Sequence, residues 1–158
     1  MEDDTPARDA IVVRSLRPED HAAVVAIDAA VLGRRREEFF GLKLKQAFAD
    51  TGIALSLAAE LDGRVAGFLL ARLYYGEFGM TERVAVLDVL DVHPDFRGRR
   101  VASALLDQLR TNLLGVGVRT LQTEVAWDSG ELVAFFRREG FVPAPRLCLD
   151  LDLEKTRT

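Results

Sequence analysis

The feature that most constrains this 158-residue chain is a junction in its middle, where an apolar segment runs into a basic turn and then into an amphipathic segment. Residues 84–92 are rich in β-branched side chains and predict a buried strand. Val101, Leu105 and Leu109 recur at four-residue spacing, which predicts a helix directly after the turn. The chain is therefore expected to contain a strand, a tight turn and a helix in immediate succession.

The turn of this junction predicts an anion-binding site. The first N–H groups of a helix have no partner inside the helix, and the helix dipole adds about half a positive charge there. Arg97, Arg99 and Arg100 add three guanidinium groups, and Gly98 lets the backbone approach a ligand closely. A phosphate or diphosphate is the expected occupant. A basic turn alone also fits a solvated helix start, so the choice between this and an anion-binding site depends on the rest of the sequence.

Composition limits the partners. With 49% hydrophobic and 29% charged residues, the chain has the make-up of a soluble globular domain. Its net charge of −4 argues against bulk attraction to nucleic acid or anionic membranes, so the arginine cluster is a local feature. Cys148 is the only cysteine, and no metal cluster is expected. No apolar run approaches the ~20 residues of a membrane span, and the acidic N-terminus is unlike a secretory signal, so we expect a cytoplasmic protein.

The remaining periodicity predicts one domain over residues 1–158, with a flexible tail over residues 1–10. Strands are expected at 11–16, 53–61, 64–74, 84–92, 119–127 and 147–153, and helices around 22–33, 34–48, 101–113 and 131–139. Asp62 and Gly63 form a two-residue hairpin turn between two of these strands. A strand, a helix and a second strand across 84–127 imply a right-handed parallel crossover, which makes the sheet mixed.

The junction resembles the acyl-CoA-binding turn of the GNAT superfamily of N-acetyltransferases, which reads Q/R-x-x-G-x-G/A after V-x-P. Arg97, Val101 and Ala102 fit this pattern, whereas Arg100 stands where the family normally has glycine. A second segment, residues 134–141, is similar to the family's A-x-x-F-Y-x-x-x-G-F signature. The tyrosine that many members use as general acid would fall at Phe136, which has no hydroxyl.

The resemblance implies an α/β (α+β) fold with a central mixed, mostly antiparallel twisted sheet of six to seven strands and about four helices. The fourth and fifth strands would be parallel and splayed, with the pantetheine arm of acetyl-CoA, the co-substrate, in the gap. The residues implied to bind the cofactor are Leu90, Asp91 and Val92 along the arm, Arg97, Gly98, Arg99, Arg100, Val101, Ala102 and Ser103 at the diphosphate, and Asp128 and Phe135 on the far side.

Acyl transfer to a primary amine requires a base, because an amine with a pKa of roughly 10 is protonated at neutral pH. Asp88 is the leading candidate, since it interrupts an apolar strand, lies on the same strand face as Val92 and resembles in position a glutamate of polyamine-acetylating members. Asp91, on the opposite face, is the second candidate. Asp88 also fits a structural role in which it pairs with an arginine. Tyr74, Tyr75 or a bound water could protonate the departing thiolate, or it could leave unassisted.

The sequence thus predicts an N-acetyltransferase that passes an acetyl or other short acyl group from acyl-CoA to a primary amine by direct attack in a ternary complex. The alternative is a catalytically weak CoA-binding or regulatory module. The expected partners are acetyl-CoA and an amine acceptor that the sequence does not identify, whereas nucleic acid and membrane are not expected. The sequence leaves open whether a second copy of the chain is a partner in a homodimer. The charged run 34–38 fits either a solvated helix end or the rim of an acceptor site.

Overall fold

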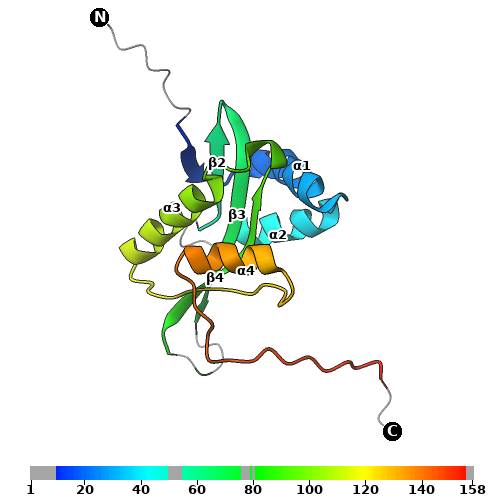
Figure 1. Ribbon diagram of the computed structural model, residues 1–158, viewed down its shortest axis with the longest axis vertical. Helices are drawn as coiled ribbons and strands as arrows, with labels where there is room; N and C mark the ends of the chain where they lie inside the picture. Colours follow the sequence, from blue (N-terminus) through cyan, green and yellow to red (C-terminus); the bar gives the residue numbers. More distant parts are fainter. Residues whose placement is uncertain (1–9, 50–54, 76–78, 80, 156–158) are drawn as a thin grey trace, which may run out of the picture. The chain divides into compact units, whose positions relative to one another are not determined.

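The computed structural model describes residues 10–49, 55–75, 79 and 81–155 (Figure 1). Its elements in chain order are β1 (Val12–Ser15), η1 (Pro18–Asp20), α1 (His21–Leu32), α2 (Glu37–Ala49), β2 (Leu57–Leu61), β3 (Arg64–Tyr75), β4 (Arg83–Val92), η3 (Pro94–Phe96), α3 (Val101–Gly115), β5 (Leu121–Thr123) and α4 (Gly130–Arg138). They fall into two compact units, residues 1–124 and 125–158.

The sheet lies in the first unit, and among the described residues it has five strands in the order β1-β2-β3-β4-β5. The first three pairings are antiparallel and the last, β4 with β5, is parallel, as the sequence predicts. Asp62 and Gly63 connect β2 to β3 with positive φ angles of 54° and 70°, which suits the twist of a two-residue hairpin. Residues 53 and 54 of the second expected strand lie outside the described residues.

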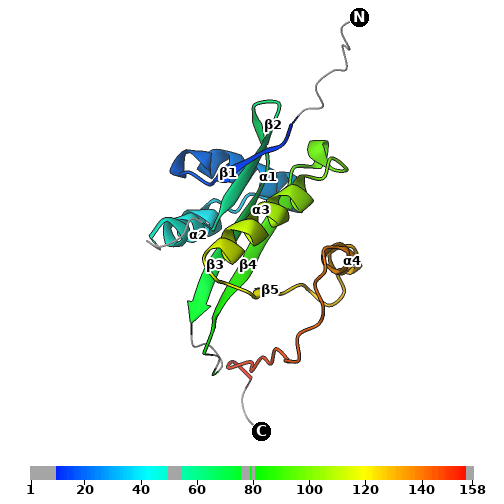
Figure 2. The same cartoon turned by 90° about the vertical axis from the view of Figure 1, so that its left-hand side faces the viewer.

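Helices cover both faces of this sheet (Figure 2). On one face, side chains of α1 and α2 form a core with Ala58, Phe68 and Leu70 of the sheet. On the other face, α3 packs across β2, β3 and β4. Because neighbouring strand residues alternate between faces, Gly67 belongs to the α3 face, next to the first turn of that helix. The expected junction is therefore held in place by packing: its strand has α1 and α2 on one face of the sheet, and its helix, α3, packs on the other face.

The second unit differs from the expectation at its C-terminal end. The helix predicted near residues 131–139 is present as α4, and Phe136 is buried against the rings of Phe135 and Phe141. The strand predicted at 147–153 is not formed: residues 141–155 contain no strand. The four alternating leucines of this segment, Leu147, Leu149, Leu151 and Leu153, are between 82% and 87% exposed. Alternation specifies which face a strand would bury, but it does not supply a partner strand.

Gly67 offers a test of how tightly β3, β4 and α3 pack. A Cβ added there would meet the carbonyl oxygen of Asp91 at 2.9 Å and Cγ1 of Val101 at 3.0 Å. We expect Gly67→Ala to lower the free energy of unfolding by about 1–3 kcal/mol, because backbone atoms must move to accept the methyl group. The matched control is Gly41→Ala in α2, where a Cβ meets nothing within 4 Å and a helix-favouring residue should be neutral or stabilising. Urea unfolding of both variants measures the difference, and equal stabilities would contradict the packing described.

Candidate functional site

Strand β4 contains a β-bulge at Asp88. Val89 pairs with Leu70 of β3 and Leu87 pairs with Ala71, so Asp88 is an extra residue without a cross-strand partner. The bulge changes the side-chain alternation that the sequence analysis assumed. Asp88 does not share a face with Val92, because it contacts Lys43 of α2 whereas Val92 lies on the α3 face. Asp88 and Asp91 both face α1 and α2, so the prediction that they lie on opposite faces is wrong.

The pairing of β4 with β5 ends next to the bulge. Parallel pairing joins residues 85–87 to residues 121–123, and the Thr123 hydroxyl donates a hydrogen bond to the carbonyl of Leu87 at 3.0 Å. Beyond Leu87, no strand of the described residues pairs with this edge of β4. The open edge, residues 88–92, contains Leu90, Asp91 and Val92, the backbone positions that the sequence analysis assigned to the pantetheine arm.

The open edge leads directly into the basic turn. Within the turn, Gly98 and Arg100 both have left-handed backbone conformations, with φ of 75° and 63°. Arg100 is the N-cap of α3, and its side chain makes no capping hydrogen bond. The first helical hydrogen bond runs from the N–H of Ala104 to the carbonyl of Arg100 at 3.0 Å, so the amides of Val101 and Ala102 precede the helical ladder. The side chain at the N-cap thus does not close the mouth of α3.

The guanidinium groups of the turn are displayed at the surface. Arg97, Arg99 and Arg100 are exposed, as is Gly98. Buried Phe96 supports the turn from below, and the guanidinium groups of Arg99 and Arg64 lie 5.8 and 5.3 Å from its ring centre. Sequence reasoning missed Arg64, which comes from the start of β3. The bond from the N–H of His93 to the carbonyl of Ala66, 2.8 Å long, brings that strand end beside the turn.

Asp88 has cationic neighbours rather than the apolar surroundings expected from its strand. Nε of Arg72 lies 2.7 Å from Oδ2 of Asp88, and Nη2 of Arg72 lies 3.2 Å from Oδ1. Nζ of Lys43 approaches Oδ2 to 4.0 Å. The arginine pairing that the sequence left open as an alternative is therefore present, and to accept a proton Asp88 would have to give up part of it.

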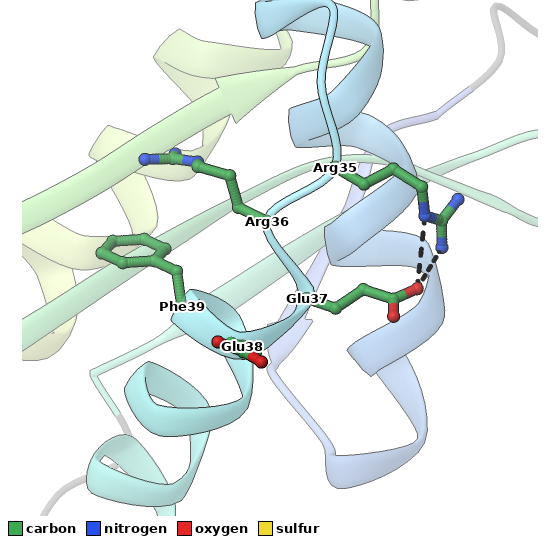
Figure 3. A pocket seen from close by; sticks show the side chains of 5 residues that line it. All are labelled: Arg35, Arg36, Glu37, Glu38 and Phe39. Carbon is green, nitrogen blue, oxygen red and sulfur yellow. Dashed lines mark hydrogen bonds and ion pairs between the residues drawn. The ribbon is translucent and has the colours of Figure 1, made fainter.

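The charged run 34–38 covers the end of the α1–α2 connection and the first residues of α2, and it borders an open cavity of about 320 Å³. Figure 3 shows the five residues that line it: Arg35, Arg36, Glu37, Glu38 and Phe39. Arg35 is engaged by Glu37, with Nη2 2.7 Å from Oε1. Arg36 lies over the ring of Phe39, 4.4 Å from its centre. The cavity therefore offers carboxylates, a guanidinium group and an aromatic face on the same side of the sheet as Asp88 and Asp91.

Arg36 also reaches a buried carboxylate, Asp28 of α1, which the sequence analysis did not single out. Nη2 of Arg36 lies 2.6 Å from Oδ1 of Asp28 and Nε lies 2.9 Å from Oδ2, a bidentate pair. The Asp28 side chain is only 1% exposed. Burial by itself raises the pKa of this carboxyl, but hydrogen bonding, chiefly from Arg36, outweighs burial and holds the pKa of Asp28 below its ordinary value. An aspartate six to eight residues before an arginine run is the only sequence signal for this pair.

Asp128 and Phe135 belong to the second unit. Asp128 is exposed in the turn before α4, and Phe135 is half-buried against Phe136. Their assignment to the far side of the cofactor stays a prediction. Among the described residues, no group of three or more histidine, cysteine, aspartate or glutamate side chains is arranged to hold a metal ion. No helix in the described part of the chain is long and apolar enough to cross a membrane.

Comparison with known proteins identifies the family. A sequence model of the Acetyltransferase (GNAT) family matches residues 19–141, which is most of the chain and includes the open edge, the basic turn and α4. The chain belongs to the GNAT acetyltransferase family. The resemblance to the GNAT superfamily that the sequence analysis found is thereby confirmed.

Solved GNAT structures share the fold at low sequence identity. An aminoglycoside N-acetyltransferase in complex with CoA is 17% identical, with a TM-score of 0.78 over 94% of this chain and 98% of that one. A ribosomal-protein-alanine N-acetyltransferase from Brucella melitensis biovar Abortus 2308 is 19% identical, with a TM-score of 0.71 over 91% and 99%. A GNAT acetyltransferase from Brucella melitensis in complex with acetyl-CoA is 22% identical, with a TM-score of 0.64 over 86% and 85%. The mixed GNAT-like fold predicted from sequence is confirmed, with five strands among the described residues.

Arg100 supplies a prediction because it combines a strained backbone with an exposed charge. Arg100→Gly should raise the free energy of unfolding by up to about 1 kcal/mol, since glycine adopts the left-handed conformation without strain. The same change should weaken CoA binding about 3- to 10-fold through loss of the guanidinium group, and Arg100→Glu should weaken it further. Calorimetric titration with CoA measures both variants against Lys45→Glu, a charge reversal on the exposed side of α2. An unchanged CoA affinity in Arg100→Glu would contradict a phosphate-binding turn.

Proposed function

We propose that this GNAT protein is an N-acetyltransferase that transfers an acetyl or other short acyl group from acetyl-CoA to a primary amine. One observation carries the proposal: the edge of β4 at residues 88–92, which no described strand pairs with, continues into a basic turn and a helix whose N-cap side chain makes no capping hydrogen bond. A strand edge offers hydrogen bonds to an extended amide-containing arm, and the helix mouth offers them to a diphosphate. Acetyl-CoA contains both groups in this order.

In the proposed complex, Leu90, Asp91 and Val92 bind the pantetheine arm through their backbone. The turn from Arg97 to Ser103 binds the diphosphate through its amides, and the guanidinium groups of the turn supply the countercharge. We keep Asp128 and Phe135 as proposed contacts on the far side. The CoA complexes of the aminoglycoside and Brucella relatives support this assignment by similarity of fold.

The acceptor is proposed to enter at the cavity lined by residues 35–39. Glu38 and Glu37 are exposed there, and carboxylates at an entrance attract an ammonium group. Two structural relatives are named for acceptors as different as an aminoglycoside and a ribosomal-protein alanine, which share only an amine. We therefore propose the acceptor class, a primary amine, and no particular molecule.

The chemistry proposed is direct attack of the amine on the thioester. The only cysteine of the chain, Cys148, is exposed, and no covalent intermediate is needed. Asp88 and Asp91 are the two carboxylates on β4 that can receive the proton of the amine. Phe136 cannot protonate the departing thiolate, so we assign that step to Tyr74, Tyr75 or water. A cytoplasmic location and a homodimer stay predictions.

Two measurements test the proposal. Acetyl-CoA should raise the thermal unfolding temperature of the protein by several degrees, because a ligand that binds only the folded state stabilises it. Release of the CoA thiol, followed with a panel of primary amines, should then exceed the rate without amine for at least one acceptor. Stabilisation without thiol release across the panel would favour the CoA-binding module, to which the missing hydroxyl at Phe136 points. No stabilisation would contradict both functions.

A further inference from the structure

A pair of carboxyl groups lies at the contact between α1 and β4. Asp28 is almost fully buried on α1, and Asp91 is half-buried on β4, one residue from the end of the strand. The two carboxyl groups are within hydrogen-bonding range of each other. Such a pair is costly when both members are ionised, because like charges at this distance repel strongly away from water.

The two members of the pair differ in their hydrogen bonds. Both oxygens of Asp28 accept hydrogen bonds from Arg36. Oδ2 of Asp91 is buried and accepts no hydrogen bond from any of the described residues. A buried carboxylate oxygen without a donor is unfavourable, whereas a protonated carboxyl can donate to the neighbouring carboxylate. One proton shared by the pair, held mainly on Asp91, satisfies both groups.

The electrostatic surroundings agree with this assignment. Burial, together with the hydrogen bond and charge of Asp28, raises the pKa of Asp91 to about 7, against a smaller opposing effect of Arg36. The charged groups facing Asp91 are thus Asp28 from α1 and Arg36 from the α1–α2 connection, and Arg34 acts on Asp28. From β3 the cross-strand neighbour is Phe68, which is apolar. Asp91 can therefore gain and lose a proton near neutral pH.

Asp91 also lies on the strand edge to which we assign the pantetheine arm. Its backbone belongs to the open edge of β4, and its side chain faces the helices α1 and α2. Through Asp28 and Arg36 it connects to the cavity that Arg36 lines. Asp88, in contrast, is held by Arg72 and lies near Lys43. Of the two aspartates on this edge, Asp91 has the uncommitted oxygen.

We propose that Asp91, rather than Asp88, accepts the proton that the attacking amine loses, and that Asp28, held by Arg36, positions and tunes it. This inference rests on the proposed acetyl transfer. The lone pair of the amine forms the C–N bond to the thioester carbonyl carbon, the C–S bond breaks, and its electron pair leaves on the sulfur. The proton shed by the nitrogen passes to the Asp91 carboxylate and from there to solvent, while the thiolate takes a proton from Tyr74, Tyr75 or water, as proposed above.

The kinetic test uses an amine that supports thiol release in the parent protein. The parent's kcat/KM should fall as the pH drops below about 7, because Asp91 must be ionised to accept a proton. Asp91→Asn should lower kcat about 100-fold or more with little change in KM for acetyl-CoA, whereas Asp88→Asn should lower it less than about 10-fold. Asp28→Asn should move the acidic limb of the pH profile down by about one unit, since it removes a neighbouring negative charge. Asp107→Asn, on the exposed side of α3, is the control.

A stability measurement shows whether Asp91→Asn folds and whether the proton is where we place it. The pKa of Asp91 is higher in the folded protein than in the unfolded chain, so its contribution to stability is complete below about pH 4 and is lost as the pH rises to about 7. Asparagine resembles the protonated carboxyl in shape and can donate to Asp28. The unfolding temperature of Asp91→Asn relative to the parent should therefore increase from pH 4.5 to pH 8.

The outcomes separate this inference from the function on which it rests. An active parent with a comparably active Asp91→Asn overturns the role of Asp91 while the acetyltransferase function stands. A loss in Asp88→Asn equal to that in Asp91→Asn, or a stability difference independent of pH, also overturns the inference. A parent that binds acetyl-CoA but releases no thiol with any amine overturns both proposals.

Discussion

The site depends on one extra residue in β4. At Asp88 the bulge leaves β3 paired with β4 on one side, whereas pairing with β5 stops at Leu87 on the other. A sheet that continued its parallel ladder would satisfy the backbone of residues 88–92 internally and leave nothing for a ligand. Because the ladder stops, the strand keeps its position in the sheet through β3 and presents its other edge outward. The bulge thereby coincides with an edge inside a sheet that no described strand pairs with, the edge that is proposed to bind the pantetheine arm.

A second constraint acts where that edge meets α3. The chain must turn sharply between His93 and Val101, and it does so with two left-handed residues, Gly98 and Arg100. Glycine adopts this conformation readily, but arginine adopts it at a cost of about 1–2 kcal/mol. The cost is met by packing on both sides: Phe96 is buried beneath the turn, and Val101 is buried against β3. The strain is local to the residue just before the helix, whose first amides precede the helical ladder and follow the exposed Arg99 and Arg100 in the chain.

Most of the fold could be predicted from the spacing of apolar residues, because each spacing is typical of one kind of secondary structure. The four-residue spacing of Val101, Leu105 and Leu109 requires a helix, and the hairpin at Asp62 and Gly63 has few alternatives. The prediction of a strand at 147–153 was wrong because periodicity alone does not make a strand. Its alternating leucines satisfy the pattern of a strand, yet a strand forms only where another supplies hydrogen bonds, and sequence does not state the partner.

The candidate site was predictable only in part. The basic turn is contiguous in sequence, so its residues could be named. The face of the sheet on which Asp88 lies could not be predicted. Assigning faces by alternation along β4 assumes an uninterrupted strand, and one bulge reverses the assignment for the residues before it. The contact between Asp28 and Asp91 joins a helix and a strand far apart in the chain, and no local pattern marks it. Sequence thus named the turn that is proposed to bind the anion, and only the packing of α1 on the sheet brought out the carboxyl pair.

The central claim is that the free edge of β4 and the mouth of α3 together form one surface for acetyl-CoA. Hydrogen exchange of the backbone amides, measured with and without acetyl-CoA, tests it most directly. The account predicts that amides in residues 88–92 and 97–104 exchange about ten-fold more slowly, or slower still, in the presence of acetyl-CoA, with little change in β1 and β2. Protection confined to other segments, or unchanged exchange in both of these segments at saturating acetyl-CoA, would contradict it.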